Sequence, residues 1–457
     1  MGFVLSILYF LTYYLTPTVM FGSMAEYRVE LILAAVIFFV SIPSFGGSSV
    51  GKTSQALALI GLAFATFMSV LIGASWASGG LTALLLFIPN AFAYLLVCLH
   101  CTTKRKVQGV ILMMLFVCFF VIAQGAVEMR NGLPQGLDAR EVHMDGSYFL
   151  GMSNEQKEWF YRLRGQGQIN DPNDFAQLIV CLLPLMFFFW QKKKTVRNVV
   201  FVLLPVGILL WGAFMTHSRG SILALLAVLT VALRKKIGTV PSLLLAALLF
   251  VGASATGYTG GRDISASSGE DRTELWGDGL QLLKSHPLFG IGFGYMPDAI
   301  GKTAHNTIVV CAAELGLCGL FFWSMFLFPS IRDALVVAWP KNIVEKKAPM
   351  LSATSFPLPP PGGGAAMPDE ADIRKLARLL VLSFVGFMVS GWFLSRAFVL
   401  TLFLLGGLTE VTFQMALQRG MVSPRLPLAR ILRYSGLCTI GFILVMWITL
   451  RIVNLTH

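Results

Sequence analysis

An arginine stands between two apolar runs in the middle of the chain. The stretch FMTHSRGSILALL (214–226) contains Arg219, with no acidic residue near it in the sequence. A charge at a bilayer boundary is costly unless an anionic group meets it. Because guanidinium is permanently charged, Arg219 at this place indicates an anionic ligand that arrives from outside the chain. Alternatively, the Arg219 side chain extends to the phosphates of membrane lipids. His217, two residues earlier, is expected either to support Arg219 from behind or to face the lipid headgroups.

A second arginine begins an amphipathic stretch, SSGEDRTELWGDGLQLLKSHPLFG (267–290). Leu275, Gly279 and Leu282 share one helical stripe after Arg272, which predicts a helix at the membrane surface. Arg272 is a second candidate for binding an anionic ligand. The competing interpretation is a local ion pair with Glu270, Asp271 or Glu274.

A histidine stands where the next apolar run begins, in TAHNTIVV (303–310). Imidazole has an ordinary pKa of about 6.5 and can take a proton from a hydroxyl at neutral pH, so His305 is a candidate general base. Asn306 is a candidate for contact with a glycan or for supporting the site from behind, and both residues could instead only cap the following helix. Glu314 is roughly half a helical turn out of phase with His305, so the two should not touch. An intramembrane carboxylate is a functional candidate or a hydrogen-bonding group between helices.

Further polar residues lie in RLRGQGQINDPND (162–174). The candidates for contact with a glycan or a phosphate in this stretch are Arg162, Arg164, Asp171, Asn173 and Asp174. The letters DPND are also typical of a helix start, with Asp171 or Asn173 as its cap.

The composition places these residues in a polytopic membrane protein. Of 457 residues, 56% are hydrophobic and 13% charged, and the mean hydropathy is +0.74. The net charge of +12 comes from Lys and Arg in short loops between apolar segments, which indicates membrane orientation and argues against nucleic-acid binding. The seven cysteines lie mostly inside apolar runs and do not resemble a disulfide framework.

Thirteen apolar windows predict an all-α protein with 12–13 transmembrane helices: 3–21, 30–45, 55–73, 81–99, 107–124, 174–190, 197–215, 220–234, 240–257, 305–328, 376–394, 397–417 and 431–452. The first window lacks a cleavable-signal pattern and is expected to remain as a span. The basic clusters fall on one side if the spans alternate, so that side is predicted to be cytoplasmic: 104–106, 192–197, 234–236, 331–375 and 419–433.

This register divides the chain into alternating membrane and loop regions. The large periplasmic loop is expected to carry short helices. The predicted regions are N-terminal transmembrane helices (1–125), a periplasmic loop (126–173), central transmembrane helices (174–257), the large periplasmic loop (258–304), a transmembrane helix (305–330), a cytoplasmic Pro/Gly-rich linker (331–375) and C-terminal transmembrane helices (376–457).

Two glycine patterns resemble nucleotide-binding motifs but lack their context. GGSSVGKT (46–53) matches the phosphate-binding P-loop, yet that motif needs a preceding buried strand, and the preceding run is long and contains Pro43. GIGFGYMPDAIG (290–301) has no strand before it either. No cluster has the spacing of metal ligands, so neither a metal nor a cofactor is expected.

The ordered set of THSRG, the Arg272 segment and TAHNTIVVCAAELGLCGLFFW (303–323) resembles the O-antigen ligase and polymerase superfamily from about residue 160 to 325. The resemblance implies a bacterial inner-membrane glycosyltransferase with a periplasmic active site and an undecaprenyl-pyrophosphate-linked glycan as donor. It implies that Arg219 and Arg272 hold the pyrophosphate and that His305 activates the acceptor hydroxyl. Diphosphate is a good leaving group, so single displacement without a metal, with inversion at the anomeric carbon, is expected.

The resemblance leaves the acceptor open. A lipid A-core sugar would make the protein an O-antigen ligase, the end of another glycan an O-antigen or exopolysaccharide polymerase, and a protein side chain an O-glycosylation ligase. The competing class is a transporter or flippase for an anionic lipid or sugar, whose expected mark is paired broken helices around a site near mid-membrane.

Overall fold

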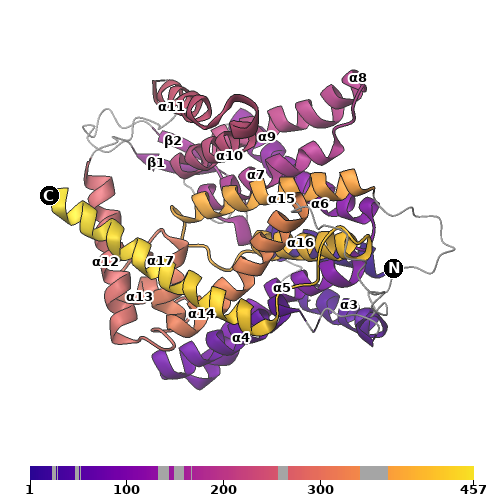
Figure 1. Cartoon of the computed structure of the whole chain (residues 1–457). Helices are drawn as coiled ribbons and strands as arrows, with labels where there is room; N and C mark the ends of the chain where they lie inside the picture. The colour runs from indigo at the N-terminus through magenta and orange to yellow at the C-terminus, as the bar shows by residue number, and fades with distance from the viewer. Residues whose placement is uncertain are drawn as a thin grey trace. The chain divides into compact units, whose positions relative to one another are not determined.

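A computed structural model describes residues 1–457 except 23–26, 28, 47–50, 52, 132–143, 149–158, 166, 256–265, 340–368 and 457. The described residues are almost entirely helical, which confirms the predicted all-α class (Figure 1). One small antiparallel hairpin was not predicted. Its strands are β1 (Met144–Tyr148) and β2 (Trp159–Leu163), with Met144 opposite Leu163.

The chain forms two compact units. The first comprises Met1–Val40, Lys104–Ile264 and Leu379–Ser390. Its centre is α7, which is buried along nearly its whole length and packs against α6, α9 and α10. The elements of this unit are α1 (Gly2–Leu15), α2 (Pro17–Met20), most of α3 (Val29–Gly46), α6 (Lys104–Asn131), the hairpin, α7 (Pro172–Met186), α8 (Thr195–Asn198), α9 (Leu204–Met215), α10 (Arg219–Ile237), α11 (Thr239–Ala255) and the middle of α15 (Glu370–Gly391).

The second unit comprises Ser41–Thr103, Ser265–Arg378 and Gly391–His457. Its centre is α14, which packs against α4, α12, α16 and α17, while α16 also packs against α5 (Figure 1). Its helices are α4 (Ser54–Met68), α5 (Ala77–His100), α12 (Ala266–Ser285), α13 (Met296–Ile300), α14 (Thr307–Ala338), α16 (Leu400–Gln418) and α17 (Leu428–Thr456).

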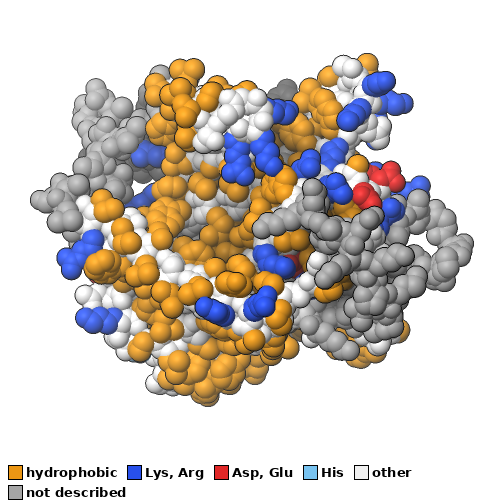
Figure 2. All heavy atoms as spheres, viewed as in Figure 1, with side chains coloured by type: hydrophobic (Ala, Val, Ile, Leu, Met, Phe, Trp, Pro, Cys, Tyr) orange, Lys and Arg blue, Asp and Glu red, His pale blue; other side chains and the backbone are white. Residues whose placement is uncertain are grey.

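The helices are those of a multi-pass membrane protein. In the described part of the chain, nine helices are long and apolar enough to cross a membrane, and Gly2–Leu15 and Thr239–Gly252 are shorter apolar helices. Every predicted apolar window coincides with a helix. Hydrophobic side chains accordingly cover much of the face seen in Figure 2. Helices also reach into the range 331–375 predicted as linker, because α14 continues to Ala338 and α15 starts at Glu370.

The central helix α14 is broken at Gly316, which has φ 65° and ψ −164°. Residues on both sides of the break bond to the segment 287–292 instead of to their own helix. The N–H groups of Leu317 and Cys318 donate to the carbonyls of Pro287 (2.8 Å) and Leu288 (3.1 Å). In return, the N–H groups of Ile291 and Gly292 donate to the carbonyls of Ala313 (3.0 Å) and Glu314 (3.1 Å). The break therefore leaves these backbone groups paired inside the protein, as an apolar environment requires.

We predict that Gly316→Ala destabilises the protein by at least about 2 kcal/mol. Its φ lies in the left-handed region, and a Cβ there would lie 2.5 Å from backbone atoms of Leu288. Thermal unfolding in detergent would measure the loss. The matched control is Gly441→Ala in α17, where a Cβ meets nothing within 4 Å. Equal midpoints for both variants would contradict a required glycine.

Candidate functional site

His305 lies immediately before α14 on a short, polar connection. Its backbone has φ 48°, which is unusual for a residue with a side chain, and the residue is exposed. The His305 N–H donates to Ser395 Oγ at 2.8 Å, and Ser395 Oγ donates in turn to Thr303 Oγ1 at 2.7 Å. These bonds hold the backbone in its strained conformation and leave the imidazole accessible. A group placed in this way can receive a proton from a bound substrate.

Asn306 has a capping role. Its Oδ1 accepts hydrogen bonds from the N–H groups of Ile308 (2.9 Å) and Val309 (3.1 Å) at the first turn of α14. Its Nδ2 donates to the carbonyl of Trp392 at 3.2 Å, and the residue is fully buried. The capping interpretation therefore holds for Asn306, whereas His305 precedes the cap.

Arg272 lies in the first half of α12, close to the same connection. One turn later, Trp276 Nε1 donates to the carbonyl of Ala304 at 2.8 Å, which ties α12 to the residue before His305. The Arg272 guanidinium lies 6.0 Å from the centroid of the Phe393 ring. Burial lowers the pKa of Arg272 from its usual value, so its charge is partly withdrawn from water. A partly desolvated guanidinium binds a phosphate more strongly than an exposed one.

The alternative interpretation of Arg272 as a local ion pair does not hold for Glu274, the one of its three proposed partners whose side chain is described. Among the described side chains, no carboxylate forms an ion pair with Arg272, and Glu274 is exposed. The side chains of Glu270 and Asp271 lie outside the described residues.

Sequence reasoning missed the segment 391–399, which joins α15 to α16 and surrounds this site. Its residues contact both candidate groups: Phe393 lies beside Arg272, and Ser395 bonds to the backbone of His305. Trp392 adds an edge-to-face contact with Trp276, with ring centroids 5.8 Å apart. The only signal in the sequence is a polar Ser-Arg pair between two apolar windows, which reads as an ordinary short connection.

The carboxylate of Glu314 is hydrogen-bonded inside the protein. It is 6% exposed, and its carboxylate accepts hydrogen bonds from the backbone N–H groups of Gly294 and Met296. The glycine-rich segment dismissed as a dinucleotide motif thus folds against α14, with positive φ at Gly290, Gly292 and Gly294. The contacts favour the hydrogen-bonding interpretation of Glu314, with one donor from the loop, Gly294, and one from the first residue of α13, Met296.

Arg219 belongs to the first unit, where it is the first residue of α10. Ser218 caps this helix, because its Oγ accepts from the N–H of Ser221 at 3.4 Å. His217 has φ 48°, and its ring centroid lies 5.6 Å from that of Phe214. Arg219 is half-buried at the helix N-terminus, where the helix dipole adds to its positive field.

A buried arginine organises the turn before Arg219. Arg162 is 7% exposed, and its Nε donates to the carbonyl of Thr216 at 2.9 Å while its Nη2 donates to Asn173 Oδ1 at 3.1 Å. The contact occupies Asn173, a predicted ligand-contact residue. Of the two predicted caps of α7, Asp171 is the cap, because its Oδ1 accepts from the Asn173 N–H at 2.7 Å. Arg164, which follows β2, is half-exposed and remains a candidate.

The P-loop interpretation of residues 46–53 has the wrong structural context. The preceding run is helix α3, not a strand, and Thr53 caps α4 by accepting from the Ala56 N–H at 3.1 Å. Thr53 also shares a hydrogen bond with the Tyr94 hydroxyl at 3.3 Å. Lys52 lies outside the described residues. Among the residues that the structure describes, no group of three or more His, Cys, Asp or Glu side chains could hold a metal ion.

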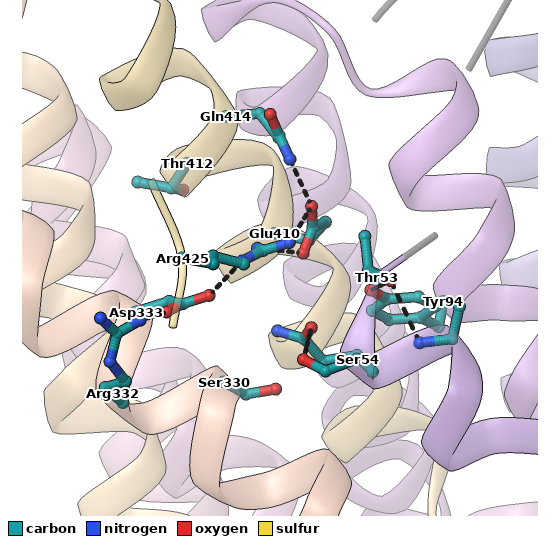
Figure 3. A network of polar contacts seen from close by, with 12 residues as sticks. Thr53, Ser54, Tyr94, Ser330, Arg332, Asp333, Glu410, Thr412, Gln414 and Arg425 are labelled. Carbon is teal, nitrogen blue, oxygen red and sulfur yellow. Dashed lines mark hydrogen bonds and ion pairs between the residues drawn. The ribbon is translucent and has the colours of Figure 1, made fainter. Parts of the chain in front are cut away.

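A second polar cluster, also missed from the sequence, lies between α14 and α16 (Figure 3). Arg425 Nε donates to Asp333 Oδ2 at 2.8 Å, and its Nη1 and Nη2 donate to the two carboxylate oxygens of Glu410. Arg332 also pairs with Asp333 at 2.7 Å, and Gln414 donates to Glu410 at 2.9 Å. Both carboxylates are fully buried. Every charge in this cluster has a partner, so it is a structural network that ties the α16–α17 connection to α14.

We predict that Arg425→Met destabilises the protein by about 3–5 kcal/mol, because it leaves two buried carboxylates without their shared cation. The triple variant Arg425→Met, Asp333→Asn, Glu410→Gln should regain most of that loss. Thermal midpoints in detergent would measure both. A triple variant no more stable than Arg425→Met would show that the arginine acts through packing rather than charge.

Comparison with known protein families matches residues 204–324 to the O-antigen ligase family. The matched segment runs from the start of α9 into α14 and contains Arg219, Arg272, His305 and Glu314. It covers the later part of the range 160–325 over which the sequence predicts the resemblance. A comparison of the chain with curated proteins found no match. Over residues 204–324 the chain is therefore similar to the O-antigen ligase family, and the predicted resemblance is confirmed for this segment.

Proposed function

We propose that the protein transfers a glycan from an undecaprenyl-pyrophosphate carrier to an acceptor hydroxyl at the periplasmic face of a bacterial inner membrane. The observation that carries this proposal is the arrangement around His305. The exposed imidazole of His305 and the half-buried guanidinium of Arg272 both adjoin segment 391–399, His305 through the bond of its backbone to Ser395 and Arg272 through Phe393. The family match contains these two residues and Arg219.

Each group has one task in the proposed reaction. The acceptor oxygen attacks the anomeric carbon of the donor sugar while His305 takes the hydroxyl proton. The bond between that carbon and the diphosphate oxygen breaks, and its electron pair leaves with the diphosphate. Arg219 and Arg272 stabilise the growing negative charge on the diphosphate through charge-assisted hydrogen bonds. The single displacement inverts the anomeric carbon, and the histidinium then releases its proton to water.

The proposed reaction requires an acceptor that carries a hydroxyl group. We propose a ligase acting on a lipid A-core sugar. The alternatives are a polymerase acting on the end of another glycan and a ligase for protein O-glycosylation. All three use the same donor and the same base, so a labelled product would distinguish them.

The broken helix α14 is a feature that transporters also use, where the break leaves backbone groups for the substrate. Here those groups at Gly316 are bonded to segment 287–292, and the Glu314 carboxylate is bonded to Gly294 and Met296. The break is filled by the protein itself. We therefore favour chemistry at the end of α14 over passage through its middle.

We predict that His305→Gln lowers the release of free polyprenyl pyrophosphate by at least about 100-fold, because the acceptor loses its base. Protein in lipid nanodiscs would be given the lipid-linked glycan and a cell-envelope extract, and the released carrier would be measured. His286→Gln, a change at another exposed histidine of the second unit, is the matched control and should keep wild-type release.

Other outcomes would discriminate between the competing hypotheses. Equal release by wild type and His305→Gln would exclude His305 as the base but would still support a glycosyltransferase function. Folded wild-type protein that binds the carrier lipid and releases none would favour the transporter.

We predict that Ser395→Ala lowers kcat by about tenfold with little change in KM for the donor, because His305 loses the acceptor of its backbone N–H and shifts from its productive position. Ser395→Thr keeps the hydroxyl and should restore most of the rate. Ser285→Ala, at an exposed serine of α12, serves as control. A rise in KM at unchanged kcat would indicate that Ser395 acts on donor binding.

A further inference from the structure

The connection between α7 and α9 presents a group of cations on an apolar surface. Lys193, Lys194 and Arg197 line a shallow hollow of about 570 Å³ together with Thr195, Val196, Val200 and Phe201. The three cations are exposed, and no acidic residue lines the hollow. The basic group is seen over α8 at the upper right of Figure 2. We call this surface the α8 hollow.

The backbone of this connection is fixed by one buried side chain. Asn198 is 4% exposed, and its Oδ1 accepts from the Gln191 N–H at 2.9 Å while its Nδ2 donates to the Gln191 carbonyl at 2.7 Å. The paired bonds close the loop 191–198. Within it, Lys193 adopts φ 62°, a left-handed conformation that costs energy in a residue with a side chain. The cations are thus presented by a built turn, not by a loose tail.

The apolar part of the hollow indicates its environment. Val196, Val200 and Phe201 are 78%, 46% and 60% exposed, although all three are hydrophobic. Trp190, at the start of the loop, is 40% exposed and stacks on Phe187 with ring centroids 6.3 Å apart. A half-exposed tryptophan next to lysines is typical of the membrane–water interface. At that depth a cation meets lipid phosphates, and an apolar side chain meets acyl chains.

We propose that the α8 hollow is a binding site for an anionic phospholipid. Its phosphate would lie among Lys193, Lys194 and Arg197, and its acyl chain would lie along Val200 and Phe201. Both halves of such a lipid find a complementary surface, whereas a zwitterionic lipid adds a cationic headgroup where three cations already stand. The proposal is independent of the glycosyltransferase function, since it uses none of the residues assigned to that reaction.

The test is lipid retention by the whole protein, purified from nanodiscs of phosphatidylcholine containing phosphatidylglycerol and measured by native mass spectrometry. We expect wild type to retain phosphatidylglycerol selectively. The triple variant Lys193→Gln, Lys194→Gln, Arg197→Gln should lose it with roughly tenfold weaker binding. Asn198→Ala keeps all three charges but loses the loop closure, and should also weaken retention.

The matched control changes three equally exposed cations at the end of α10: Arg234→Gln, Lys235→Gln, Lys236→Gln. The control should retain phosphatidylglycerol like wild type. Equal losses in both triple variants would show diffuse attraction of anionic lipid to basic loops and overturn the proposal. Equal retention of phosphatidylcholine and phosphatidylglycerol by wild type would overturn it as well.

Discussion

The second unit depends on the hydrogen bonding of one broken helix. An apolar surrounding offers no water to a freed N–H or C=O group, so a break in a span is stable only if another part of the protein completes it. In α14 the segment 287–292 does so at Gly316. The same helix carries Asn306 as its cap, which holds the connection containing His305, and further along it carries Asp333. A substitution at Gly316 is thus expected to disturb both the connection that contains His305 and the ion pairs of Asp333.

Arg425 and Arg272 differ in how their charges are compensated. Arg425 is surrounded by two carboxylates and by the ring of Phe413, whose centroid lies 4.6 Å from the guanidinium carbon. Its charge is neutralised within the fold, which stabilises the packing of α14 and α16. Arg272 is desolvated beside Phe393 without an ion pair to any carboxylate among the described side chains. A cation left in that state favours an anionic ligand, and a diphosphate presents several negatively charged oxygens that match the guanidinium fork.

Local signals made much of this structure predictable. Hydropathy alone placed the helical windows, and the letters DPND predicted a helix cap at Asp171 or Asn173, of which Asp171 is the cap of α7. The sequence also placed His305 and Asn306 correctly at the start of a helix. Contacts between distant segments were not predictable. Ser395 and His305 are 90 residues apart, Arg425 and Asp333 are 92 apart, and neither pair follows a repeating pattern. Gly316 is likewise one of several glycines in an apolar run, and only its φ reveals the break.

The proposed function assigns binding of the donor's diphosphate to Arg219 and Arg272. The most direct test is the affinity of the protein in nanodiscs for polyprenyl pyrophosphate relative to polyprenyl monophosphate. We expect wild type to bind the pyrophosphate at least about tenfold more tightly, because it offers a guanidinium group more negative charge and more acceptor oxygens than the monophosphate. Arg219→Gln and Arg272→Gln should each remove that preference. A preference that survives either substitution would contradict the role proposed for that arginine and exclude it from binding the diphosphate.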